Sequence, residues 1–439
     1  MIDFIVNYIL LFLILISALV VLHELGHYGA AKLLGIKTSA FALGMGPILF
    51  RKMDRSGTEW RICAFPIGGY VAFPSIENGT ENPYERPTDK RKLAEFKKTI
   101  YGAHPIQKIL IYVAGPLVNL LVAYLLYCVL IFVQGGMKYP LEVAEIASTP
   151  YVNELRSGDI LLELNGMKVP TSDEEWFDFT PSTNSGNATE YKIIRESREL
   201  LVLGAPLYLA RVGGMQPNSA ALDAGMRVGD VITKVNGEKI VHFRDLAEVV
   251  QNSRGGLIRL EVWRNGSFVQ TEIQPRVRPN SDSTGFYEQW MIGVASPALP
   301  FDFEVKSRDV GFFQSSLNAS FALWYMIKSS LSGIKAIVIG AISTCNMTGP
   351  IGIAEMTGDV AKQGTFEVFS LVASISLALA IFNMLPIPPF DGFHIVFATA
   401  NWVARERIPY SVMNAFTFAG VVLFAFLFLF ISWQDIFCV

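Results

Sequence analysis

The most constraining feature of this chain is a pair of histidines at the end of an apolar run that is long enough to cross a membrane. The run Phe4–Leu22 leads directly into His23-Glu24-Leu25-Gly26-His27. Residues four apart lie on one face of a helix, so His23 and His27 can offer two imidazole nitrogens to one Zn²⁺, with Glu24 beside them as a general base. Ionisable residues in membrane segments are rare and usually functional, which disfavours the alternative of helix-end polar residues without a metal.

Composition indicates a membrane protein with a soluble part. The chain is 51% hydrophobic and 17% charged, which is too apolar for an ordinary soluble protein and too charged to lie wholly in lipid. Its formal net charge of −3 and its lack of basic tracts predict no nucleic-acid partner.

The cysteines predict neither a thiolate zinc site nor redox chemistry, because they are widely spaced and form no Cys-x-x-Cys pair. They are Cys63, Cys128, Cys345 and Cys438. We expect no important disulfide, with Cys345 as a lone thiol.

Four segments are predicted to span the membrane as helices, at about 4–34, 106–133, 366–390 and 412–433. The predicted fold class is therefore a multi-pass α-helical membrane protein.

One further apolar segment, Asn318–Ser343, contains Lys328 and Lys335. We expect it to be an interfacial or re-entrant helix, because a fifth span would carry the end of the third span to the face opposite the histidine motif.

Charge asymmetry predicts the orientation. The loop 35–105 has more basic than acidic residues, and Arg405 and Arg407 precede the last predicted span, so both loops are expected to be cytoplasmic. The region 134–314 has more acidic than basic residues and is expected outside, together with both termini. The third span then ends on the same side as the histidine motif.

The candidate for a third metal ligand stands at the end of the third span. There the stretch Asn383-Met384-Leu385-Pro386-Ile387-Pro388-Pro389-Phe390-Asp391-Gly392 places one acid after a proline-broken apolar helix. A catalytic zinc needs three protein ligands and an open position, and a carboxylate is acceptable beside two histidines. Asp391 is the best candidate. The alternatives are that Asp391 only caps a helix, or that His394 is the ligand.

On these residues the chain resembles the site-2 protease family of intramembrane zinc metalloproteases, and within it the bacterial members with a double PDZ insertion. The matching motifs follow the family's order over nearly the whole chain: His23-Glu24-Leu25-Gly26-His27, Gly68-Gly69-Tyr70-Val71, Ala114-Gly115-Pro116 with Asn119, Gly349-Pro350-Ile351-Gly352, and Asn383 through Gly392. The family commonly has Leu-Asp-Gly-Gly-His where this chain has Phe390-Asp391-Gly392-Phe393-His394. The Asp-Gly core is kept, but helix packing after it can differ.

The resemblance implies one Zn²⁺ per chain, held by His23, His27 and Asp391, with Glu24 as the catalytic base. It also implies that Asn383 donates a hydrogen bond to the substrate backbone or to the oxyanion. The alternative for Asn383 is that it only satisfies a broken helix end.

The resemblance further implies a membrane-embedded β-loop at about 41–73, where an unwound substrate segment pairs as an added strand. The residues expected to bind the substrate there are Gly68, Gly69, Tyr70 and Val71. An ordinary cytoplasmic hairpin is the alternative.

The middle of the chain contains an internal repeat. The stretch Gly158-Asp159-Ile160-Leu161-Leu162-Glu163-Leu164-Asn165-Gly166 recurs as Gly229-Asp230-Val231-Ile232-Thr233-Lys234-Val235-Asn236-Gly237, and each copy closes on Asn-Gly, a tight-turn signal. The copies resemble PDZ domains of bacterial proteases, which predicts β-rich domains at 140–205 and 206–280. PDZ domains bind peptide C-termini by strand addition, and in the second copy the predicted carboxylate loop comprises Leu207, Tyr208, Leu209 and Ala210. Alternatively, both copies only obstruct access and bind no peptide.

The predicted organisation is a first membrane half at 1–139, the two β-rich domains, a linker with the interfacial helix at 281–365, and a second membrane half at 366–439. The resemblance implies a bacterial inner-membrane protease, with its active site near the cytoplasmic side and its PDZ domains acting outside as a size filter. Its implied substrates are single-pass membrane proteins already trimmed by another protease, such as an anti-sigma factor remnant, and signal peptide remnants. The alternatives from other classes are a membrane scaffold that captures peptide C-termini and, less favoured, a transporter.

Overall fold

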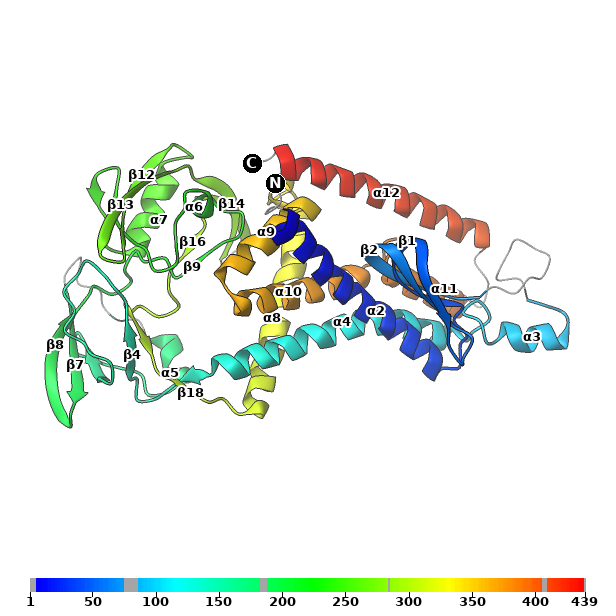
Figure 1. The fold of residues 1–439 in the computed structure, drawn as a ribbon, viewed down its shortest axis with the longest axis horizontal. Coiled ribbons are helices and arrows are strands. Elements are labelled where there is room, and N and C mark those ends of the chain that lie inside the picture. Colours follow the sequence, from blue (N-terminus) through cyan, green and yellow to red (C-terminus); the bar gives the residue numbers. More distant parts are fainter. Residues whose placement is uncertain are drawn as a thin grey trace. The chain divides into compact units, whose positions relative to one another are not determined.

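The computed structural model describes residues 5–74, 86–179, 181, 188–282, 285–404 and 409–437. The chain forms two compact units (Figure 1): a helical unit from 1–130, 317–331 and 347–439, and a sheet unit from 131–316 and 332–346. Arg405 and Arg407, on which part of the predicted orientation depends, lie outside the described residues.

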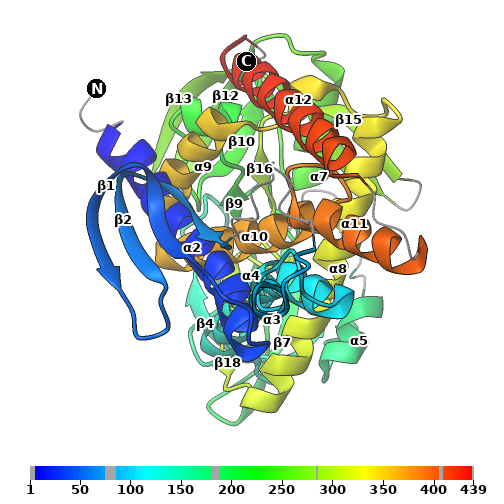
Figure 2. The same ribbon diagram turned by 90° about the vertical axis from the view of Figure 1, so that its right-hand side faces the viewer.

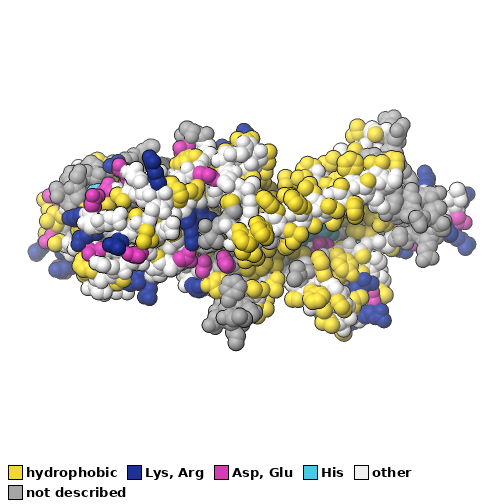
Figure 3. All heavy atoms as spheres, turned by 90° about the horizontal axis from the view of Figure 1, so that it is seen from above, with side chains coloured by type: hydrophobic (Ala, Val, Ile, Leu, Met, Phe, Trp, Pro, Cys, Tyr) yellow, Lys and Arg dark blue, Asp and Glu magenta, His cyan; other side chains and the backbone are white. Residues whose placement is uncertain are grey.

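Four helices of the helical unit are long and apolar enough to cross a membrane, which confirms that prediction. The first is Tyr8–Leu33, which comprises the end of η1 (Ile5–Leu10) and all of α2 (Leu11–Leu33). The second and third are α4 (Pro105–Gln134) and α10 (Thr365–Asn383). The fourth is Ser411–Phe437, within α12 (Tyr410–Phe437). Hydrophobic side chains cover much of the visible face of the helices (Figure 3), as lipid contact requires. Helix α10 ends before the predicted limit of 390, because the proline-rich segment that follows cannot continue a helix.

Helices α2 and α4 approach closely at the histidine motif. A Cβ atom added at Gly26 would lie 2.5 Å from the carbonyl oxygen of Ala114, which is closer than a real side chain allows. Small residues permit such close helix packing in membranes. The motif is therefore held against α4.

Strands β1 (Ala40–Met53) and β2 (Glu59–Ala72) form a long, bent hairpin beside α2 (Figure 2). The first part of β1, Ala40–Leu43, pairs with Gly69–Ala72 at the end of β2 and also lies beside Glu59–Ile62 at its start. The last part of β1 pairs with the same start of β2. The segment Gly69–Ala72 thus lies at an edge of the small sheet, with α2 as its neighbour.

The turn of this hairpin is fastened to α2 by Asp54. Its carboxylate accepts hydrogen bonds from the backbone N–H groups of Ser56 (2.8 Å) and Thr58 (2.9 Å), the hydroxyl of Tyr28 (2.9 Å) and the indole N–H of Trp60 (3.3 Å). Hydrogen bonding, from the Ser56 side chain above all, holds the pKa of Asp54 well below its usual range. Because Tyr28 directly follows the histidine motif in α2, Asp54 fixes the hairpin relative to that motif.

Four further helices contribute to the helical unit as described. Helix α8 (Phe312–Val338), in the segment predicted to be interfacial or re-entrant, belongs to this unit over 317–331 and packs Leu323 with Ala123 of α4 and Leu377 of α10. The remaining helices are α3 (Lys90–Phe96), α9 (Pro350–Gln363) and α11 (Asp391–Ala404).

The start of α9 is capped by a carboxylate from α12. Asp435 accepts hydrogen bonds from the backbone N–H groups of Gly349 (2.8 Å), Ile351 (3.1 Å) and Gly352 (3.1 Å). A carboxylate is favourable there because the first N–H groups of a helix have no partner within it. The motif Gly349-Pro350-Ile351-Gly352 thus joins α9 to α12.

The sheet unit contains two copies of one arrangement, which confirms the internal repeat. The first sheet has the order β6-β5-β7-β8 and the second β11-β10-β12-β13. Their strands are β5 (Ile160–Leu164), β6 (Met167–Lys168), β7 (Thr189–Arg195), β8 (Arg198–Gly204), β10 (Val231–Val235), β11 (Glu238–Lys239), β12 (Ile258–Arg264) and β13 (Ser267–Ile273). Each copy has a bidentate ion pair at the same place, between Asp159 and Arg195 and between Asp230 and Arg264, with N–O distances of 2.6 to 2.8 Å.

The two copies are nested rather than consecutive, so the predicted boundaries at 205 and 280 are wrong. The second core includes Ile292 and Val294, beyond residue 280, while the first core includes Phe301 and Phe303. The first copy is completed by β17 (Phe303–Val305), which pairs with β4 (Val143–Ile146). The closing strands come from distant segments, and local sequence patterns do not show such pairings.

Several short elements finish the sheet unit. In the second copy β16 (Val294–Ala295) pairs with β9 (Gly214–Met215), and at the base of the unit β18 (Ser307–Arg308) pairs with β3 (Gly136–Met137). Strands also occupy part of the predicted linker 281–365. The other elements are α5 (Asp173–Asp178), α6 (Ala220–Asp223), α7 (Phe243–Asn252), β14 (Arg276–Asp282), β15 (Gly285–Met291) and η2 (Thr344–Asn346).

The cysteine prediction needs one correction. Cys63 and Cys128 are free and buried, but Cys345 is disulfide-bonded and is not a lone thiol. The sequence spacing alone does not show which segments meet.

We predict that Asp54→Ala loosens the turn of the β1–β2 hairpin. Loss of the shared acceptor should speed amide hydrogen exchange at Ser56 and Thr58 by about tenfold, as expected for one hydrogen bond. Because the pKa of Asp54 is lower in the folded than in the unfolded chain, the wild-type contribution should be complete above about pH 4 and be lost as the pH falls further. Unchanged exchange in the variant at neutral pH would contradict this role.

Candidate metal centre

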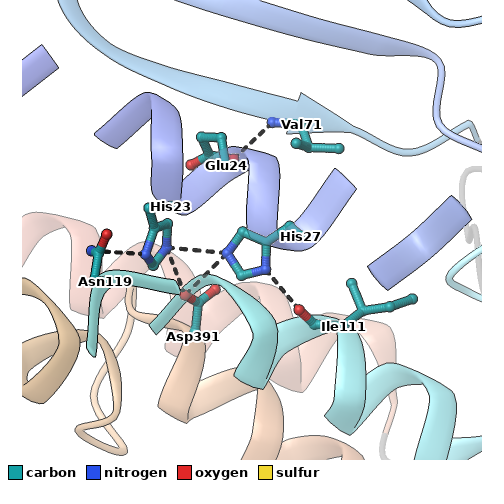
Figure 4. Close-up of polar contacts among 7 residues, drawn as sticks. All are labelled: His23, Glu24, His27, Val71, Ile111, Asn119 and Asp391. Atoms are coloured by element: carbon teal, nitrogen blue, oxygen red, sulfur yellow. Dashed lines mark hydrogen bonds and ion pairs between the residues drawn. The ribbon is translucent and has the colours of Figure 1, made fainter. Parts of the chain in front are cut away.

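Three candidate ligands, from two elements far apart in the chain, meet in the helical unit (Figure 4). His23 and His27 lie one turn apart on α2, and their Nε2 atoms are 3.1 Å from each other. Oδ2 of Asp391, the first residue of α11, lies 3.1 Å from Nε2 of His23 and 3.2 Å from Nε2 of His27. Both histidines are buried, and Asp391 is largely so. The predicted ligands are thus brought together.

This group of atoms fits a zinc ion. Two ligands about 2.0–2.1 Å from a tetrahedral ion lie roughly 3.3 Å apart, close to the three separations found here. Gly115 of α4 lies directly against the two histidine rings. A Cβ atom added at Gly115 would lie 2.7 Å from Nε2 of His23 and closer still to Nε2 of His27. Any larger residue would fill the space beside the ligand atoms. Among the described residues, this is the group of His, Cys, Asp and Glu side chains whose spacing suits a metal.

Glu24 lies beside the ligand group without belonging to it. Its carboxylate accepts a hydrogen bond from the backbone N–H of Val71, at 3.0 Å, in the edge segment of β2. A cavity of about 320 Å³ adjoins Glu24 and the candidate ligands. It is lined by His23, Glu24, His27, Tyr70, Val71, Phe73, Ile111, Tyr112, Asn383, Pro389, Asp391 and His394. Glu24, the candidate catalytic residue, therefore lies between the candidate metal ligands and the edge segment of β2.

The predicted substrate-binding residues are distributed around this cavity. Tyr70, Val71 and Asn383 line it, whereas Gly68 and Gly69 do not. Gly69 serves the sheet instead, because a Cβ atom there would lie 2.7 Å from the carbonyl oxygen of Ala42 on the paired strand. Gly68 has φ +75°, which favours glycine.

His394, the rival ligand, also lines the cavity but is not part of the ligand group. Its ring stacks on that of Tyr112, with centroids 4.9 Å apart and planes 16° apart. The structure therefore favours Asp391 as the third ligand.

Helix α4 supplies partners for the other ring nitrogens of both histidines. Nδ1 of His27 is 2.7 Å from the carbonyl oxygen of Ile111, and Nδ1 of His23 is 3.2 Å from the side-chain amide of Asn119. Such outer contacts orient metal-binding histidines. Sequence reasoning noted Asn119 only as part of a family motif, although Ile111, Gly115 and Asn119 are spaced four apart and so share one face of a helix.

The predicted carboxylate loop of the second β-rich copy, formed by Leu207, Tyr208, Leu209 and Ala210, has two of its backbone donors occupied. All four residues but Tyr208 are buried, and the N–H groups of Tyr208 and Ala210 donate within the chain. The N–H of Tyr208 donates to the carbonyl of Pro300 and that of Ala210 to the carbonyl of Val241, both at 2.8 Å. These two N–H groups are not free for a peptide carboxylate, and carboxylate binding by this loop stays a prediction.

A His-His-Asp ligand group with an adjacent glutamate, set among membrane-length helices, defines a membrane-embedded metallopeptidase. The chain belongs to Peptidase family M50, whose family model matches residues 11–427. This confirms the predicted resemblance to the site-2 proteases.

Relatives of known name cover most of the chain. The Regulator of sigma-E protease RseP of Escherichia coli (strain K12) is 27% identical over 414 residues, which is 88% of each protein. R01501 of Rhizobium meliloti (strain 1021), named as a candidate zinc metalloprotease, is 25% identical over 426 residues, or 97% of this chain and 95% of that protein. A solved PDZ domain of the SdrC-like protein from Listeria monocytogenes matches 20% of this chain and 85% of that structure, at 18% identity and a TM-score of 0.16, a likeness too weak to show a shared fold.

We predict that Gly115→Ala strongly weakens metal binding. The added methyl group would occupy the space beside both Nε2 atoms, so zinc affinity should fall by at least about 100-fold, beyond the usual effect of changing an outer contact. Zinc content after purification and a chelator competition measure this. Gly29→Ala on α2 is the matched control, because a Cβ atom there meets nothing within 4 Å. Equal zinc binding by the two variants would contradict the placement of the metal.

Proposed function

We propose that the protein is an intramembrane zinc endopeptidase that cleaves transmembrane segments of single-pass membrane proteins. The observation that carries this proposal is the convergence of His23, His27 and Asp391 beside Glu24 and an edge strand, among membrane-length helices. The three ligands would hold one zinc ion per chain. The zinc metalloprotease name of a relative supports the choice of metal.

Glu24 acts as the general base and acid of peptide hydrolysis. When bound, zinc supplies a Lewis acid that polarises the scissile carbonyl and makes water more acidic. Glu24 takes one proton from the attacking water as the new C–O bond forms, and returns it to the amine nitrogen as the C–N bond breaks. A carboxyl and an amine are the products, so atoms and protons balance.

The edge of β2 presents the substrate to Glu24. A helical substrate must unwind before its backbone can be attacked, and pairing with Gly69–Val71 as an added strand replaces hydrogen bonds that it loses. The N–H of Val71 already faces the site, since it donates to Glu24. We assign Tyr70 and Val71 to direct contact with substrate, and Gly68 and Gly69 to the shape of the strand.

Asn383 is assigned to the substrate backbone or the developing oxyanion. It is the last residue of α10 and lines the cavity with Asp391, so its amide can donate a hydrogen bond near the reacting carbonyl.

The sheet unit is assigned to the outside of a bacterial inner membrane, as a size filter built of two PDZ domains. Disulfides persist in oxidising compartments, so the disulfide at Cys345 in this unit supports its external location. The active site would then lie near the cytoplasmic side, as the basic loop 35–105 predicts. The family resemblance implies that the substrates include an anti-sigma factor remnant, trimmed beforehand by another protease, and the E. coli relative is named as a regulator of sigma-E. Signal peptide remnants and peptide C-termini are further candidate ligands.

We predict that Glu24→Gln loses turnover but keeps zinc. Loss of the base should lower the rate of cleavage of a transmembrane substrate by about 10²–10⁴-fold, the usual contribution of general acid–base catalysis. Zinc content should be unchanged, because Glu24 is not in the ligand group. Glu95→Gln is a control on the surface of the helical unit, and full turnover by Glu24→Gln would refute the mechanism.

We also predict that excision of the sheet modules removes discrimination by substrate size. The pairing of Met137 with Ser307 brings the ends of the insertion together, so residues 138–306 can be replaced by an Asn-Gly turn. The shortened enzyme should still cleave a trimmed substrate, and should cleave an untrimmed one at a similar rate in proteoliposomes. Discrimination equal to that of the wild type would contradict the filter.

A further inference from the structure

The side-chain amide of Asn119, on α4, is buried, and one of its polar atoms has no hydrogen-bond partner. Its side chain is 0% exposed, its Nδ2 lies 3.2 Å from Nδ1 of His23, and its Oδ1 is buried without a hydrogen-bond partner. A second contact fixes the backbone at this position, because the hydroxyl of the buried Ser376 on α10 donates to the carbonyl of Asn119 at 2.8 Å. Buried polar atoms are rarely left unpaired, so Oδ1 needs an explanation.

The orientation with Nδ2 facing His23 conflicts with metal binding. If Nδ2 donates to Nδ1, then Nδ1 carries no proton and the neutral ring must carry it on Nε2. Nε2 is the atom that faces Asp391 and His27, where a ligand needs a free lone pair. A protonated Nε2 cannot bind a metal.

His27 shows what the site requires. Its Nδ1 faces the carbonyl oxygen of Ile111, which can only accept, so Nδ1 carries the proton and Nε2 is free. His23 needs an acceptor at the corresponding place. Turning the Asn119 amide by half a turn gives His23 that acceptor, because Oδ1 then faces Nδ1 and Nδ2 takes the former place of Oδ1.

We propose that Asn119 is the positioning residue that fixes the proton of His23 on Nδ1, and so frees its Nε2 to bind the metal. Its Oδ1 accepts from Nδ1–H of His23 when the site is loaded. Ile111, Gly115 and Asn119 then form one functional face of α4, which orients His27, leaves space for the ion, and orients His23. This inference rests on the proposed metal site and adds the residue that prepares one of its ligands.

The test compares zinc binding by variants of the full-length chain, by competition with a chromophoric chelator. Asn119→Leu keeps the volume but removes the acceptor, and should lower zinc affinity by about 10–100-fold, as for other contacts of this kind. Asn119→Asp can only accept, and should bind zinc at least as tightly as the wild type. Ser376→Ala is the matched control, because it removes the neighbouring hydrogen bond without touching the amide. Thermal unfolding without metal shows whether each variant is folded.

A direct measurement keeps the inference testable if Asn119→Asp does not fold. In the zinc-loaded wild type, ¹⁵N spectra of labelled histidine should show His23 protonated on Nδ1 and unprotonated on Nε2, assigned through the His23→Gln variant. Wild-type affinity in a folded Asn119→Leu, affinity in a folded Asn119→Asp as low as in Asn119→Leu, or a protonated Nε2 would overturn the role of Asn119. Absence of zinc binding by the wild type would instead refute the proposed function itself.

Discussion

The structure depends on the contact between three candidate ligand atoms that belong to α2 and α11, segments more than half the chain apart. Polar side chains are costly among membrane helices unless they are paired. His23, His27 and Asp391 meet this requirement by facing one another, which brings the second half of α2 and the start of α11 to a shared point. The proline-rich break after α10 allows Asp391 to turn into that point.

The neighbouring helices α4 and α10 pack closely around these three side chains. Gly26 lets α2 approach Ala114, and Gly115 leaves the space in which the ligand atoms converge. Ser376 ties α10 to α4 at the level of Asn119. The hairpin is brought to the same place from the other side of α2, through Tyr28 and Asp54. Small residues and buried hydrogen bonds, rather than large apolar side chains, therefore decide the geometry of the centre.

Much of this architecture could be predicted from the sequence, because its signals are local. Helix length and apolarity predicted the four membrane-length segments, the spacing of His23 and His27 predicted a shared face, and the lone acid Asp391 stood out in an apolar context. The internal repeat was visible as two similar sequence segments, 158–166 and 229–237. Asn119 was within reach too, since its spacing from Gly115 equals that of the two histidines.

What could not be predicted depends on pairings between distant segments. The N–H groups of Tyr208 and Ala210 donate to the carbonyls of Pro300 and Val241, and the first sheet core is closed by Phe303, after the whole second copy. The partner of Cys345 is likewise chosen by the fold. Turn and strand patterns report neighbours along the chain, and they contain no information about which remote carbonyl or strand will be adjacent.

The matching ion pairs Asp159–Arg195 and Asp230–Arg264 have a consequence for the origin of the sheet unit. Two unrelated modules would have no reason to pair a carboxylate at the corresponding position with an arginine from the corresponding strand. The two ion pairs are also nearly identical in geometry. Such agreement in a buried detail is what two copies of one duplicated module retain. The second copy then lies within the first, between the segments that together form the first core.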